Sequence, residues 1–91
     1  MKIVKSLTHL KKLSNIDGYA EFYIMLAGGL CRSGKRICYY PKSKTFDIHN
    51  EIDDTWQDNI TEEELPNQSM IPEAIEKGAL VYCGFQLNGI K

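Results

Sequence analysis

The sequence predicts an α+β fold, with a three- or four-stranded antiparallel sheet and two or three short helices packed on one face of it. Three observations lead to this class. Apolar and polar residues alternate in three consecutive segments that are joined by short turns. Other segments carry capping residues and apolar side chains at helical spacing. The chain has 91 residues, the size of a single small domain.

Two helices are predicted from their first residues. Residues 6–15 begin with Ser6, a good N-cap, and leucines recur at every third position with lysines on the other side. Residues 61–65 read TEEEL, which has the form of a capping box. In that motif Thr61 caps the helix and Glu64 reaches back to the Thr61 backbone, while the acids favour the positive end of the helix dipole.

A further helix is predicted within residues 69–80. Pro72 suits the first turn of a helix, and Gly78 is placed to end it. Polar residues dominate after the last apolar segment, so the chain from 86 to 91 is expected to be a frayed tail. All the predicted elements belong to one domain, residues 1–91.

The predicted strands are residues 19–26, 35–40, 45–50 and 79–85. In the first strand, alternation places Phe22, Ile24 and Leu26 on the inward face. In the third strand, Phe46 and Ile48 point inward. Short turns join the first three strands, which predicts an antiparallel meander.

One stretch resembles a phosphate-binding loop. GLCRSGKR at 29–36 fits the template G-x-x-x-x-G-K-[ST] except at the last position, where Arg36 replaces the metal-holding hydroxyl. A phosphate loop also needs a helix after it, whose N-terminus holds the phosphates. Here the residues after Lys35 alternate as in a strand and reach Pro41 too soon for a helix. The pattern therefore argues against nucleotide hydrolysis.

Charge is divided between the two halves of the chain. Residues 1–44 hold nine Lys and Arg and two acids, whereas residues 45–91 hold two Lys and ten acids. No Lys or Arg occurs within residues 45–76. This division predicts either one basic and one acidic surface, which would orient partners, or two halves that interleave in the fold and neutralise each other.

The basic half contains a candidate nucleic-acid site in the hairpin 30–44. Cations that contact phosphates and aromatic rings that stack on bases are the ingredients of single-strand binding. The candidate residues are Arg32, Lys35, Arg36, Tyr40, Lys42 and Lys44. The competing interpretation is a solvated hairpin face with a tyrosine in the core.

The acidic half contains a candidate partner-binding site in an acidic, turn-rich segment. Its residues are Glu51, Asp53, Asp54, Trp56 and Asp58. A calcium loop is not expected, because the spacing is wrong and the required glycine is missing. Trp56, the single tryptophan, is expected either to cap the edge of the core or to anchor a partner.

The cysteines predict reduced, structural thiols. There are three, at 31, 38 and 83, with no C-x-x-C pair. A zinc site that adds His9 or His49 is the first alternative, but it lacks the usual short ligand spacings. A nucleophilic cysteine is the second, and Cys31 is the single candidate for it. We expect no metal and no cofactor. The sequence shows no membrane span and no signal peptide, which predicts a cytoplasmic protein.

Three segments in residues 19–82 carry a resemblance. They are, in order, EFYIMLAGGLCRSGKRICYY, HNEIDDTWQDNITEEEL and IPEAIEKGALVY. Together they resemble small proteins carried by phages and integrative elements of gut bacteria. The resemblance implies an accessory factor, including inhibitors of CRISPR and of other host defences. It transfers no catalytic residue, and Cys31 is an additional feature relative to those proteins.

The leading hypothesis is a non-enzymatic mobile-element protein that binds and inhibits a bacterial defence complex. The acidic segment 47–64 would then present a phosphate-like row of charges to a basic nucleic-acid channel in a protein or ribonucleoprotein partner. The alternative is a small nucleic-acid-binding protein that uses the hairpin 30–44. The sequence leaves the oligomeric state open.

Overall fold

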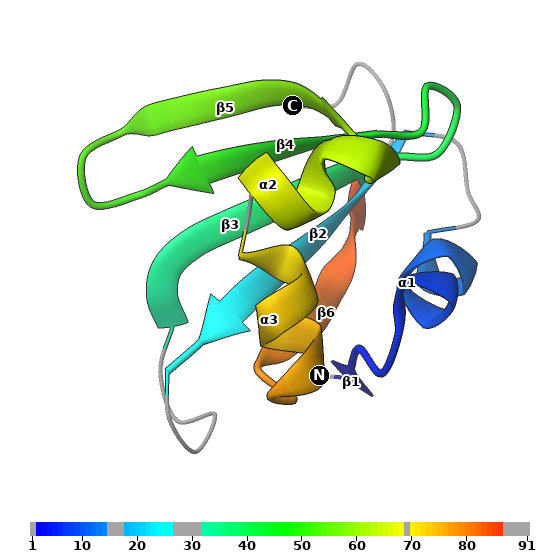
Figure 1. Ribbon diagram of the computed structural model, residues 1–91, viewed down its shortest axis with the longest axis horizontal. Coiled ribbons are helices and arrows are strands. Elements are labelled where there is room, and N and C mark those ends of the chain that lie inside the picture. Colours follow the sequence, from blue (N-terminus) through cyan, green and yellow to red (C-terminus); the bar gives the residue numbers. More distant parts are fainter. Residues whose placement is uncertain (1, 15–17, 27–31, 69, 87–91) are drawn as a thin grey trace.

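Six strands form one antiparallel sheet in the order β1-β6-β2-β3-β4-β5 (Figure 1). The computed structural model describes residues 2–14, 18–26, 32–68 and 70–86. The strands are β1 (Lys2–Ile3), β2 (Tyr19–Met25), β3 (Arg32–Tyr40), β4 (Thr45–Asn50), β5 (Thr55–Thr61) and β6 (Leu80–Gln86). The predicted class and the antiparallel pairing are confirmed.

The prediction of three or four strands is wrong, because two edge strands were not expected. β1 has only two residues, both exposed, so it carries no pattern that a sequence could reveal. β5 has the sequence TWQDNIT, and all its residues except Ile60 are exposed. An edge strand with little to bury lacks the alternation that marks a half-buried strand, so this segment was assigned to an acidic turn region.

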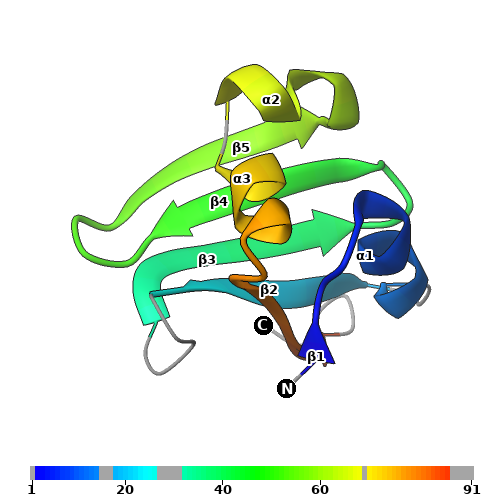
Figure 2. The same ribbon diagram turned by 60° about the horizontal axis from the view of Figure 1, so that its bottom comes forward.

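The helices lie together on one face of the sheet, as Figures 1 and 2 show. They are α1 (Leu7–Leu13), the 3-10 turn η2 (Glu62–Glu64), α2 (Leu65–Gln68) and α3 (Ile71–Glu76). No helix among the described residues covers the opposite face, which is called the open face below. None of these helices is long and apolar enough to cross a membrane.

The predicted helix signals are present at the observed helix ends. The Ser6 side chain caps α1 by accepting from the backbone N–H of His9, at 3.0 Å. The Glu64 carboxylate accepts from the backbone N–H of Thr61, at 2.9 Å, so the capping box is confirmed, although it opens a 3-10 turn rather than an α-helix. Gly78, which follows the C-cap Lys77 of α3, has φ +69°, the conformation that glycine favours there.

The core fills the space between the sheet and the helices. Phe22, Ile37 and Phe46 are fully buried on the helix side of β2, β3 and β4. Leu10 of α1 and Ile71 of α3 are fully buried against them. The predicted inward positions on β4 are therefore confirmed.

Two residues do not lie where the sequence predicts them. Leu26 follows the last residue of β2 and is 51% exposed, so it does not continue the inward row of Phe22 and Ile24. Gln86 is not part of a frayed tail, because it pairs with Tyr19 as the last residue of β6. Residues 87–91 and Cys31 lie outside the described residues.

Candidate functional site

Four side chains form one row across the open face. Arg36 of β3 pairs with Tyr23 of β2 on one side and with His49 of β4 on the other. His49 in turn pairs with Trp56 of β5. The neighbouring residue in each inner strand belongs to the core, and side chains alternate along a strand. The row therefore points away from the helices.

Trp56 is exposed but held in place by its neighbours. Its ring stacks on His49 with centroids 4.3 Å apart and an interplanar angle of 12°. The Arg36 guanidinium carbon lies 5.5 Å from the Trp56 ring centroid, within the range of a cation–π contact. Even so, 45% of Trp56 remains exposed. A large aromatic side chain that is already ordered loses little entropy when it is covered, as at interface hot spots.

Arg36 is anchored on its other side by a carboxylate. Its Nη1 atom lies 3.5 Å from Oε2 of Glu21, and both side chains are mostly buried. The Nε atom of Arg36 is buried and has no hydrogen-bond partner among the described residues. Because Glu21 offsets the positive charge of Arg36, the guanidinium group mainly supports the Trp56 ring and is not a free cation.

His49 is oriented by the loop that follows its strand. Its Nε2 atom lies 2.8 Å from Oδ1 of Asp54. An ionised carboxylate can only accept, so Nε2 carries the proton in this contact. The ring is thus fixed between Asp54 and Trp56, and the hairpin loop and the tryptophan are held as one unit.

The loop at residues 51–54, called the hairpin tip below, is ordered by its own side chains. Asp53 Oδ1 accepts from the Thr55 hydroxyl at 2.6 Å and from the Thr55 backbone N–H at 3.2 Å. The hydrogen bond from the hydroxyl is the main reason that the pKa of Asp53 is lowered. The Asn50 side chain accepts from the N–H of Ile52. Asp53 and Asp54 therefore shape the tip as well as charge it.

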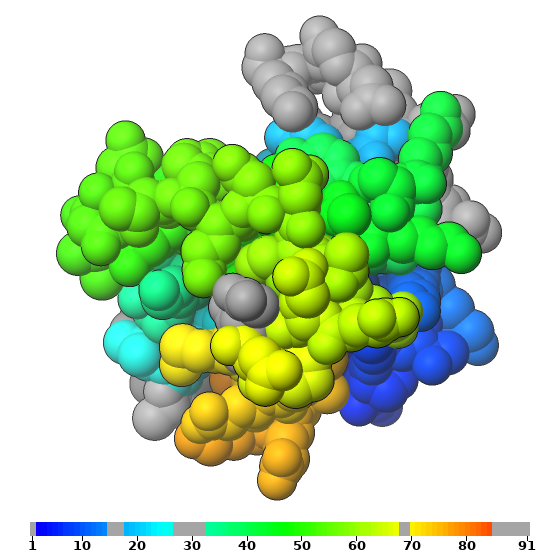
Figure 3. All heavy atoms as spheres, turned by 45° about the horizontal axis from the view of Figure 1, so that its top comes forward, coloured from blue at the N-terminus to red at the C-terminus, as the bar shows by residue number. Residues whose placement is uncertain are grey.

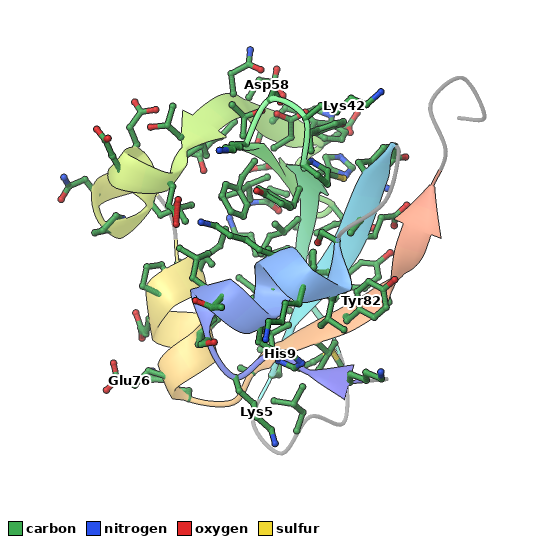
Figure 4. All side chains as sticks on the ribbon, turned by 90° about the vertical axis from the view of Figure 1, so that its right-hand side faces the viewer. Lys5, His9, Lys42, Asp58, Glu76 and Tyr82 are labelled. Carbon is green, nitrogen blue, oxygen red and sulfur yellow. The ribbon has the colours of Figure 1, made fainter. Side chains whose placement is uncertain are left out.

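Glu51, in the hairpin tip, and Asp58, in β5, are both exposed. The β4–β5 hairpin forms a lobe at the left edge of the molecule in the space-filling view (Figure 3). Figure 4 shows Asp58 at the end of the molecule remote from Lys5 and Glu76. The structure thus places all five predicted partner-binding residues on β5 and its hairpin loop.

The predicted basic residues are not gathered into one patch. Lys35 and Arg36 lie at the end of β3 next to the hairpin tip, since Lys35 pairs with Asn50. Lys42 and Lys44 lie in the turn at the other end of β3. The four residue steps from Arg36 to Tyr40, at about 3.3 Å each, already span roughly 13 Å, and Lys42 and Lys44 follow Tyr40.

Tyr40 and Arg32 complete the predicted nucleic-acid set. Tyr40 packs against Tyr19 with ring centroids 5.1 Å apart and is half-buried. Burial is the main reason that the pKa of Tyr40 is raised, and a hydrogen bond with Asp47 adds to it. The backbone of Arg32 begins β3, and its side chain lies outside the described part of the chain.

The acidic and basic halves of the chain interleave at several points. β3, from the basic half, lies beside β4, from the acidic half. Lys11 on α1 forms an ion pair of 2.6 Å with Glu62 of η2. The nearby charge of Lys35 contributes to the lowered pKa of Asp53. These contacts favour mutual neutralisation of the two halves, with net acidity left at β5 and its loop.

Three residues of the site were missed from the sequence. Glu21 and Tyr23 were not among the candidate site residues, and His49 was named as a site residue only in the zinc alternative. Strand alternation does place His49 outward. Its contact with Trp56 depends on the pairing of β4 with β5, and β5 was not predicted.

The phosphate-loop pattern and two of the cysteines lie in β3 and β6. Gly34 and Lys35 of the phosphate-loop pattern lie within β3, which continues as a strand to Tyr40, as predicted. Cys38 is buried in β3 and Cys83 is exposed on β6. In the described ranges no three His, Cys, Asp or Glu side chains come together in a group that could hold a metal ion.

Comparisons with known proteins supply no relative from which a site could be transferred. No protein-family model matches the chain, and neither a curated protein nor a solved structure matches it. A function is therefore inferred from the chemistry of the cluster around Trp56.

Proposed function

We propose that this chain is a non-catalytic protein-binding domain that engages a cationic partner surface through Trp56 and the carboxylates beside it. The observation that carries the proposal is that Trp56 is 45% exposed while it is stacked on His49 at 4.3 Å. Tryptophan and arginine are the residues most enriched at interface hot spots, and here both belong to one ordered cluster.

The charge around the cluster supports a cationic partner. Glu51, Asp54 and Asp58 lie within five residues of Trp56 along the chain, in a segment without any Lys or Arg between residues 45 and 76. Arg36, which lies next to the ring, is paired with Glu21. An arginine of the partner can stack on the exposed side of the Trp56 ring while its charge meets the neighbouring carboxylates.

The same arrangement disfavours nucleic acid at this surface. Phosphates would approach exposed carboxylates, and the cations of the hairpin are split between the two ends of β3. Nucleic-acid binding through Lys35, Lys42 and Lys44 remains the competing function, and the experiment below separates the two.

The tryptophan itself provides the assay, since Trp56 is the single tryptophan of the chain. We expect an oligoarginine peptide to change its fluorescence, and a short oligothymidylate to leave it unchanged. Trp56→Ala should weaken peptide binding in calorimetry by about tenfold or more. Fluorescence that responds to the oligothymidylate, and no longer does so in a Lys35→Gln, Lys42→Gln, Lys44→Gln variant, would establish the competing function instead.

Matched variants separate charge from shape. Glu51→Gln with Asp58→Asn removes two exposed charges without changing size, and should weaken binding and flatten its salt dependence. Lys42→Gln with Lys44→Gln, at the other end of β3, is the control and should not weaken it. Equal effects of the two pairs would contradict a local acidic site.

The resemblance to mobile-element proteins leads to a more specific proposal, in which the cationic partner belongs to a bacterial defence complex. Expression of the chain should then restore transformation by a plasmid that a CRISPR system targets. Trp56→Ala should remove this effect, and the Lys42→Gln, Lys44→Gln control should keep it. If each CRISPR system tested still blocks transformation when the chain is expressed, this specific proposal is wrong.

A further inference from the structure

β5 is the terminal strand of the sheet on the side of the candidate site. In the part of the chain that the structure describes, its inner edge pairs with β4 and no strand pairs with its outer edge. Figure 1 shows β5 as the outermost strand. Six of its seven residues are exposed. Such an edge presents backbone donors and acceptors to another strand.

The hydrogen-bond pattern indicates which backbone groups face outward. The N–H of Glu51 donates to the carbonyl of Gly34 on β3, at 2.7 Å. Backbone groups alternate in direction along an antiparallel strand, so Asn50 and Ile48 of β4 direct theirs toward β5. Their partners Thr55 and Gln57 face inward. Trp56, between these two, therefore directs its N–H and C=O away from the sheet.

Two features limit what can pair with this edge. The register of β4 and β5 shifts between Phe46 and Ile48, and Asn59 there has φ +56°, so the regular edge is the part of β5 before this irregularity. Asp54 and Asp58 flank that part, with Glu51 nearby. A second copy of β5 would bring like charges together, which disfavours self-pairing.

We propose that β5 accepts an extended, arginine-bearing segment of the partner as a seventh strand, with its backbone bonded to that of Trp56. This inference rests on the proposed function and specifies its mode. The acidic side chains that exclude a second β5 attract a cationic strand. An arginine opposite Trp56 would lie on the open face, beside the ring that already stacks on His49. Backbone pairing supplies affinity and this side chain supplies specificity.

A pair of peptides tests the mode. The probe is a short capped peptide of alternating arginine and valine, and its control carries N-methyl groups on the arginine backbone nitrogens, which face β5 when an arginine lies opposite Trp56 in an antiparallel pair. N-methylation removes the backbone donors on one edge and leaves the side-chain charges. We expect the probe to bind with a Kd of about 1 mM or tighter, and the control at least roughly tenfold more weakly. We also expect the probe to slow hydrogen exchange at the Trp56 amide, measured by NMR.

The outcomes separate this inference from the proposed function. If both peptides bind equally and perturb Trp56 fluorescence equally, strand addition is wrong and the cationic-partner function stands. If neither peptide perturbs Trp56, both proposals fail. Binding of the probe without protection of the Trp56 amide also overturns strand addition. A peptide of alternating glutamate and valine should not bind, and equal binding by it would contradict the charge argument.

Discussion

Replacing Gly34 by alanine should destabilise the protein through its backbone conformation. Gly34 lies in β3 with φ +92°, a region that side chains with a Cβ rarely adopt. Its carbonyl also accepts from the N–H of Glu51 and so supports the hairpin tip. The glycine that suggests a phosphate loop in the sequence is thus required by the strand itself.

The size of the effect follows from two contributions. A non-glycine residue in a sparsely populated backbone region costs about 1–3 kcal/mol. The added Cβ would also lie 2.9 Å from Cδ1 of Ile52, which is too close. Ile52 is 82% exposed, so its side chain can rotate away at little cost. We therefore expect Gly34→Ala to lower the free energy of unfolding by about 1–3 kcal/mol, almost entirely from the backbone.

Urea denaturation followed by circular dichroism measures this free energy, and two variants separate the contributions. Gly78→Ala is the matched control, because Gly78 has φ +69° and its Cβ would meet nothing within 4 Å. Gly34→Ala and Gly78→Ala should therefore destabilise by similar amounts. Adding Ile52→Ala to Gly34→Ala should restore little stability. Full rescue by Ile52→Ala, or a neutral Gly34→Ala, would refute the backbone argument.

Three further predictions concern the core and the titration of stability. Ile37→Val should cost about 0.5–1.5 kcal/mol in urea denaturation, because Ile37 is fully buried, whereas Ile3→Val at an exposed position should be nearly neutral. Burial raises the pKa of Tyr40 in the folded state, so the contribution of Tyr40 to stability is complete below the unfolded value of about 10 and is lost as the pH rises beyond it. Tyr40→Phe should therefore reduce the fall in the urea midpoint at alkaline pH. An unchanged fall would contradict this. The hydrogen bonds from Thr61 lower the pKa of Glu64, so the contribution of Glu64 to stability is present above the ordinary pKa of 4.5 and is lost as the pH falls through the pKa of the folded state. Glu64→Ala should therefore make stability less sensitive to acid. A steeper acid transition in this variant would contradict the prediction.

The sequence by itself determined the elements whose signals are local. Alternation in residues 45–50 identified β4 and the inward positions of Phe46 and Ile48, because burial on one face imposes a period of two. Ser6 and Gly78 marked helix ends correctly, since capping depends on residues within one turn. The strand after Lys35, which excludes a phosphate-loop helix, was also a local inference.

Tertiary structure alone decided the extent of the sheet and the composition of the site. β5 buries only Ile60, so no pattern of apolar residues marked it as a strand. Trp56 and Arg36 were assigned to rival acidic and basic sites, yet the structure brings them within 5.5 Å. That contact depends on the registers of β3 with β4 and of β4 with β5, which are set by pairing across the sheet. Such registers are long-range properties, so the residues on any single strand could not predict the cluster.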